Sequence, residues 1–169
     1  MDFYKKNNAP YEEIFNHIAD ICNLMRFCFE SDNLEEVIKA FNYLRSCEDM
    51  TSEIQLPMVL IRKRFSLSGF EYMCLMLALA SALEGKGSPT FFEAAEHYPF
   101  FQNAEVFASL VENNTLKYLL DSEEGCGLSR RFQIKSIVLN FIIEKNISHN
   151  NIFFNTYIKK YPIIYKDLY

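Results

Sequence analysis

The sequence has no tryptophan and is poor in glycine and proline, with five of each among its 169 residues. Scarce glycine argues against a loop that cradles phosphate and against an all-β fold, whose tight turns depend on glycine. Neither G-x-x-x-x-G-K-S/T nor G-x-G-x-x-G occurs in the chain, so we expect no nucleotide-binding loop in it. The composition excludes these classes without yet favouring a function.

Long apolar runs are also missing. The longest run, residues 72–83, is about 12 residues, whereas a bilayer-spanning helix needs roughly 20. The N-terminal residues lack the apolar centre of a signal peptide. The five cysteines show no C-x-x-C spacing, and Cys22 and Cys74 fall inside apolar helical runs, which is typical of a reducing compartment. We predict a cytoplasmic protein that does not enter a membrane.

Residue patterns that hold metals or perform catalysis are absent as well. The chain has no H-E-x-x-H and no carboxylate-rich calcium loop, and its three histidines, His17, His97 and His149, are far apart in sequence. We therefore expect no metal, no cofactor, no catalytic residue and no enzymatic activity in this chain. One alternative stays open: Cys126, in the turn 125–127, would be the nucleophile of a small hydrolase if a histidine lay beside it.

The chain is acidic, with a net charge of −5. Duplex DNA repels an acidic body unless basic residues gather on one face. The basic clusters of this chain are short, and each is interpreted as a solvated face; they are 62–64, 130–131 and 159–160. A protein is the expected partner, and nucleic acid is not.

The most informative feature that is present is the segment 65–83. Ser68 and Glu71 fit the S-x-x-E capping box of a helix start, in which each side chain satisfies a free backbone donor. The residues after them are apolar on nearly every face, and such a helix must be wrapped by other elements. We predict a helix over 68–84, ended by the glycines that follow it, at the centre of a small helical domain.

Apolar residues at helical spacing predict further helices on both sides of this one. Ser31 or Asp32 ends the first helix or caps the second, and Pro57 bends the third or delays its start. Ser88 is expected to cap the helix after 68–84, with Pro89 at its first position. The further predicted helices are 11–30, 33–46, 51–64, 89–97, 103–112, 135–145 and 148–160.

The period of the apolar residues changes to two near residue 116. Leu116, Tyr118 and Leu120 alternate with their neighbours, as do residues 128–134, and a polar turn with glycines separates the two runs. Three helices over 68–112 followed by such a hairpin have the order of a winged helix, in which the hairpin is the wing. The predicted fold class is therefore mainly α: a helical bundle with a winged-helix-like subdomain and one short β-hairpin.

This order suggests three parts: an N-terminal helical extension (1–64), a winged-helix-like core (65–145), and a C-terminal helix and tail (146–169). A wing that reads DNA usually works with a basic third helix. The third helix here contains Glu105 and Glu112 and no lysine or arginine, which is the wrong charge for a major groove. Protein contact is favoured, and a DNA-binding winged-helix regulator is the alternative.

Several motifs between residues 60 and 145 occur together in one known family. They are Phe65-Ser66-Leu67-Ser68-Gly69-Phe70-Glu71 with its apolar helix, Pro89-Thr90, and the run 128–134 leading into 138–142. In these the chain resembles the N-terminal winged-helix regions of bacterial AAA+ ATPases, some of them encoded with contractile injection systems. The resemblance implies a regulatory domain that recruits a client or partner subunit. If the chain is a fragment, the ATPase module with its Walker motifs lies in cis beyond it, so no catalytic residue is carried over.

Two surfaces are candidates for contact with a partner. One is the wing, with Lys117, Tyr118, Arg130 and Arg131, where the two arginines occupy adjacent strand positions and must face opposite sides. The other is an aromatic tail, because tyrosine and isoleucine near a terminus often mark an interface. Its residues are Tyr161, Ile163, Ile164 and Tyr165.

Overall fold

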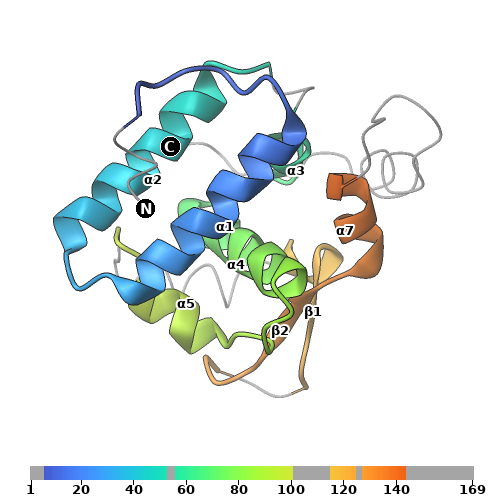
Figure 1. The fold of residues 1–169 in the computed structure, drawn as a ribbon. Coiled ribbons are helices and arrows are strands. Elements are labelled where there is room, and N and C mark those ends of the chain that lie inside the picture. Colours follow the sequence, from blue (N-terminus) through green and yellow to red (C-terminus); the bar gives the residue numbers. More distant parts are fainter. Residues whose placement is uncertain (1–5, 53–55, 101–114, 125–126, 144–169) are drawn as a thin grey trace.

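The computed structural model describes residues 6–52, 56–100, 115–124 and 127–143. Within these ranges the chain is mainly helical and carries one short antiparallel hairpin, which confirms the predicted mainly α class with one hairpin (Figure 1). The winged-helix-like subdomain stays a prediction. None of the described helices is both long and apolar enough to cross a membrane. In chain order, the elements are α1 (Ile14–Glu30), α2 (Leu34–Asp49), α3 (Pro57–Arg64), α4 (Gly69–Leu83), α5 (Phe91–His97), the 3-10 helix η3 (Leu116–Tyr118), β1 (Leu120–Ser122), β2 (Phe132–Ile134) and α7 (Ser136–Ile143).

Helix α4 is the centre of the fold, as its sequence predicts. Twelve of its 15 residues, 70–81, are buried, because α1, α5 and β2 all pack against it. In Figure 1 it lies between the α1–α2 pair and the hairpin. Its end is also as expected: Gly85 has a φ of 66°, and the N–H of Lys86 donates to the carbonyl of Ser81 at 2.9 Å, an arrangement that closes many helices.

Both hydrogen bonds of the predicted capping box are present at the start of α4. The Ser68 hydroxyl accepts from the Glu71 N–H at 3.2 Å, and the Glu71 carboxylate accepts from the Ser68 N–H at 3.0 Å. Helix α4 therefore begins with two of its free donors satisfied.

The Ser68→Ala variant should lower the free energy of unfolding by about 1 kcal/mol, because the alanine side chain cannot accept from the Glu71 N–H. Urea unfolding followed by circular dichroism measures this loss. Ser129→Ala is a matched control, since Ser129 is exposed, and its effect should stay within about 0.5 kcal/mol. Equal unfolding midpoints for the two variants would contradict the role of the cap.

Helices α1, α2 and α5 begin within three residues of their predicted starts, whereas α3 begins six residues later than predicted. Ser31 follows the last residue of α1, but the cap of α2 is Asn33, whose side chain accepts from the Glu36 N–H at 3.2 Å. Pro57 delays the start of α3 rather than bending it, because it occupies the first helical position. The cap of α5 lies two residues later than predicted.

Helix α5 is capped by Thr90, not by Ser88, and Pro89 precedes the helix. Thr90 and Glu93 form a second capping box, with bonds of 3.1 and 2.7 Å. The residues before α5 pair with the start of β2: the Pro89 carbonyl accepts from the Phe132 N–H at 2.9 Å, and Thr90 forms a bridge with Arg131. This pairing holds Pro89 outside the helix.

The hairpin lies later in the sequence than predicted. Strand β1 is Leu120–Ser122 and pairs with β2 in the register Leu120↔Ile134 and Ser122↔Phe132. Residues 116–118 are a 3-10 helix, so the strand prediction for Leu116 and Tyr118 was wrong. The reason is that Leu116 and Leu119, three residues apart, are the ones that reach the core, whereas Tyr118 is only partly buried.

One apolar cluster joins all of these elements. It contains buried residues from α1 through α7, among them Phe70, Phe132 and Phe141, which are at most 1% exposed. Helix α7 matches the predicted helix 135–145. The predicted helices 103–112 and 148–160 lie outside the described residues, and the division of the chain at residues 64 and 145 stays a prediction.

Candidate functional site

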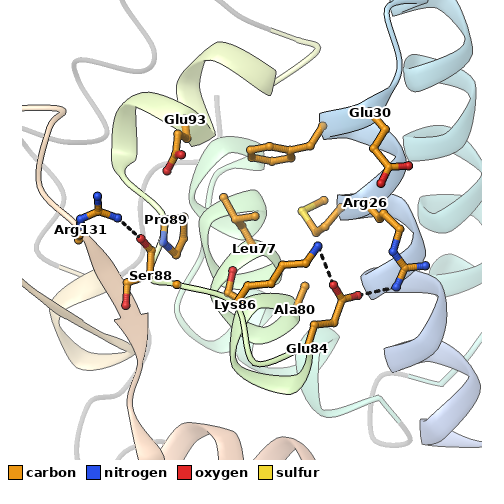
Figure 2. A pocket seen from close by; sticks show the side chains of 14 residues that line it. Arg26, Glu30, Leu77, Ala80, Glu84, Lys86, Ser88, Pro89, Glu93 and Arg131 are labelled. Atoms are coloured by element: carbon orange, nitrogen blue, oxygen red, sulfur yellow. Dashed lines mark hydrogen bonds and ion pairs between the residues drawn. The ribbon is translucent and has the colours of Figure 1, made fainter.

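A groove of about 350 Å³ lies between α1 and the loop that joins α4 to α5. We call it the α1–loop groove. Its floor is apolar: Met25 and Phe29 come from one face of α1, and Leu77 and Ala80 from one face of α4. Figure 2 shows Leu77 at the centre of the groove, with charged side chains around it.

Charged residues of both signs form the rim of the groove. Glu84, at the end of α4, joins two cations: Arg26 of α1 at 2.8 Å and Lys86 of the loop at 2.9 Å. Burial by itself raises the pKa of Glu84, but the bonds and charges of Lys86 and Arg26 outweigh it and hold that pKa below its ordinary value. The carboxylate is therefore ionised at neutral pH and ties α1 to the loop. The remaining charged lining residues are Glu30, Glu93 and Arg131.

The two arginines of the wing point to different places, as their adjacent positions predict. Arg131 lines the groove, and its guanidinium donates to the Ser88 carbonyl at 2.8 Å (Figure 2). The Arg130 guanidinium lies 5.2 Å from the centre of the Phe91 ring. Arg131 is thus the predicted contact residue that the structure brings to the groove.

The other predicted contact residues that the structure describes do not line the groove. Lys117 and Tyr118 lie on η3, where the Lys117 ammonium is 5.2 Å from the centre of the Tyr118 ring. The four tail residues, Tyr161, Ile163, Ile164 and Tyr165, lie outside the described residues. Of the four residues of the predicted wing, Arg131 therefore lines the groove, and the other three do not.

Sequence reasoning missed Arg26, Glu84 and Lys86 as site residues. The positions of Glu84 and Lys86 carried a signal, because they are charges placed directly after a long buried helix. Nothing in the sequence pairs Arg26 with Glu84, which is 58 residues away. Only the packing of α1 on α4 brings these two side chains together.

A second polar cluster lies inside the protein and joins four helices. The Glu48 carboxylate of α2 accepts from Tyr72 of α4 at 2.6 Å and from Arg62 of α3 at 2.8 Å. The imidazole Nε2 of His17, on α1, lies 2.8 Å from the same carboxylate. We call these four side chains the Glu48 cluster; all four are buried.

The charges of this cluster compensate one another. Burial raises the pKa of Glu48, yet hydrogen bonds and charges from His17 and Arg62, with the Tyr72 hydroxyl, bring it below its ordinary value. The pKa of Tyr72 is raised well above its ordinary value by burial and by the Glu48 charge, so Tyr72 stays a donor. The sequence interpretation placed His17 beside the core stripe of α1 as a satisfied helix residue. Its Nε2 contacts Glu48, but its buried Nδ1 has no hydrogen-bond partner, so the interpretation is confirmed only in part.

The described residues offer no cluster of three or more metal-ligating side chains. Cys22, Cys28, Cys47 and Cys74 carry free thiols, and burial raises the pKa of Cys28 to about 12, so that it is not a thiolate at neutral pH. Cys126, the nucleophile of the hydrolase alternative, lies outside the described residues.

The chain matches no protein-family model, no curated protein and no solved structure. The resemblance to the N-terminal regions of AAA+ ATPases therefore stays a prediction, and function must be argued from the groove itself.

Proposed function

We propose that this chain is a non-catalytic protein-interaction domain that recruits a client or partner subunit to an AAA+ ATPase. The observation that carries the proposal is the α1–loop groove, with an apolar floor and a rim of both charge signs. Such a surface suits an amphipathic segment of a partner protein, whose apolar side chains fill the groove while its polar side chains meet the rim. A uniformly basic surface, which a nucleic acid needs, is not what surrounds this groove.

The order of the elements supports the part of the proposal that rests on the resemblance. Residues 88–90, between α4 and α5, bridge to the strand that continues into β2, and β2 pairs with β1. Two helices with a short extended segment between them, followed by a hairpin that pairs with that segment, is the order expected of a winged helix. The remaining helix of that fold would be 103–112, which lies outside the described residues.

Site-specific photo-cross-linking tests the proposal. We expect p-benzoylphenylalanine placed at Lys86, an exposed rim position, to cross-link in cells to an AAA+ ATPase or to its client, identified by mass spectrometry. The same group placed at Glu35, exposed on α2, should give no such product. Adding Arg26→Glu reverses one rim charge, and we expect the product to fall about tenfold, since arginines at an interface often contribute 2 kcal/mol or more.

Two results would contradict the proposal. One is the same set of cross-linked proteins from positions 86 and 35, which would mean that the groove does not select a partner. The other is a mobility shift of duplex DNA that weakens steeply with salt, which would favour the DNA-binding regulator instead.

A further inference from the structure

A second, smaller recess of about 140 Å³ lies at the other end of α4. We call it the Arg62 recess. Its polar lining includes Glu48, Arg62 and Tyr72, and its aromatic lining is Phe41, Tyr98 and Phe100. It shares no lining residue with the α1–loop groove, although both touch α4. The recess is therefore a separate site with its own chemistry.

The hydrogen-bonding capacity left at the recess consists mostly of donors. The Glu48 carboxylate is occupied, since Tyr72 and His17 contact one oxygen and Arg62 the other. Arg62 has a side chain only 7% exposed, and among the described residues its five-donor guanidinium makes a single hydrogen bond, to Glu48. The remaining donors of Arg62 are not among the buried side-chain atoms that lack a partner, so they are open to the recess and available to an acceptor that enters it.

The rim of the recess carries a second positive charge, of the same sign as Arg62. Arg45, whose side chain is 58% exposed, also lines the recess, and its partner Asp49 is not a lining residue. Two guanidinium groups thus face a space in which the one carboxylate is already paired. An anionic acceptor fits this arrangement better than a neutral one, because hydrogen bonds between charged groups are roughly twice as strong.

The aromatic rim gives the recess a defined shape. Phe100 packs edge-on against both Phe41 and Tyr98, with ring centres 5.9 Å apart in each pair. The position next to Tyr98 is a glycine, Gly69, and a side chain at this position would collide with the Tyr98 hydroxyl. Aromatic rings beside a polar floor are typical of the pockets that receive anchor residues at protein interfaces.

We infer that the Arg62 recess binds the carboxylate of an acidic side chain presented by a protein partner. The volume argues for a side chain rather than a small-molecule ligand, since ligand sites usually enclose about 300–1,000 Å³. In this arrangement the carboxylate accepts from the free donors of Arg62, Arg45 closes over it from the rim, and the three rings pack on the aliphatic stem. The inference goes beyond the proposed function, since it concerns a different surface.

Methionine methyl NMR separates the two sites, because Met76 lines the recess and Met25 lines the groove. With 13C-methyl methionine in the full chain, titration with N-acetylglutamate α-amide should shift the Met76 signal, with a Kd on the order of 1 mM, and leave the Met25 signal in place. The glutamine counterpart has the same shape without the charge, and it should bind about tenfold more weakly.

Variants of Arg62 and Arg45 show which side chains of the recess bind the carboxylate of the probe. Arg45→Gln removes an exposed charge and should weaken binding about threefold, whereas Arg26→Gln at the groove should leave it unchanged. Arg62→Lys keeps the charge beside Glu48 but loses the guanidinium fork, and it should abolish the Met76 shift. If Arg62→Lys does not fold, the Arg45→Gln result still decides.

Three outcomes would overturn the inference. They are a Met76 signal that does not respond to the glutamate probe, an equal response to the glutamate and glutamine probes, and saturation by benzoate without any response to the glutamate probe. The last outcome would assign the recess to a free small carboxylate. None of the three bears on the cross-linking result at position 86, so failure of this inference and failure of the proposed function are distinguishable.

Discussion

Replacing Glu48 by alanine is expected to lower the free energy of unfolding by about 3–5 kcal/mol, because removing one partner of a buried ion pair leaves the other charge uncompensated. Glu48 is 2% exposed and contacts Arg62, Tyr72 and His17, so the variant leaves three buried polar groups without their acceptor. Urea unfolding followed by circular dichroism and by tyrosine fluorescence measures the loss.

Two further variants separate the charge of Glu48 from its shape. Glu48→Gln keeps the side-chain volume and one acceptor oxygen, and we expect a smaller loss of about 1.5–3 kcal/mol. Glu35→Ala is the matched control, because Glu35 forms an exposed pair with Lys39 at 3.4 Å. A Glu48→Ala variant as stable as Glu35→Ala would show that the Glu48 cluster does not hold the four helices together.

The same cluster predicts the direction of a pH effect. The pKa of Glu48 is lower in the folded chain than its ordinary value of 4.5, so the folded state favours the ionised carboxylate. This stabilisation is fully present above pH 4.5 and is lost as the pH falls through the lower, folded-state value. The stability difference between the wild type and Glu48→Gln should therefore shrink below pH 4.5, and a difference that grows there would contradict the pKa direction.

The second large effect is expected at Phe70, in the first turn of α4. Phe70→Ala should lower the free energy of unfolding by about 3–5 kcal/mol, because the ring is fully buried and its removal leaves a cavity that its neighbours cannot fill. The Phe70 ring also packs edge-on against Tyr98, with centres 5.6 Å apart, and this contact is lost as well. The urea midpoint should fall while the slope of the transition stays unchanged.

Phe15→Ala is the control for Phe70→Ala. Phe15 is 74% exposed on α1, so its truncation removes little buried surface and should change the free energy of unfolding by no more than about 0.5 kcal/mol. Equal effects at positions 15 and 70 would mean that α4 is not the centre of the core.

The sequence predicted local structure best where a single helix carries its own signals. At α4, the Ser68–Glu71 pair, the apolar residues on every face and Gly85 all indicate the same start, environment and end. Prediction was weaker where partners decide the geometry. Thr90 caps α5 because residues 89–90 pair with residues 131–132 at the start of β2, and that pairing is invisible from either segment alone.

The spacing of apolar residues at η3 was also ambiguous between a strand and a helical turn. Residues 116–120 are too few to separate a strand from a 3-10 turn, and Leu119 breaks the alternation between Leu116, Tyr118 and Leu120. The tertiary structure resolves this, because burial of Leu116 and Leu119 requires a spacing of three. Lys117 and Tyr118 therefore lie on a 3-10 helix rather than on the predicted strand. Arg131 lies beside the hairpin, as predicted, and also lines the groove.

The sequence by itself determined that this chain forms a mainly helical domain around one buried helix, because caps, glycine ends and apolar faces act within a few residues of each other. The tertiary structure alone decided which charged side chains meet. Arg26 reaches Glu84, and His17, Glu48, Arg62 and Tyr72 converge, only because the helices that carry them pack together. Pairing between distant residues depends on how helices cross, and no local pattern encodes that crossing.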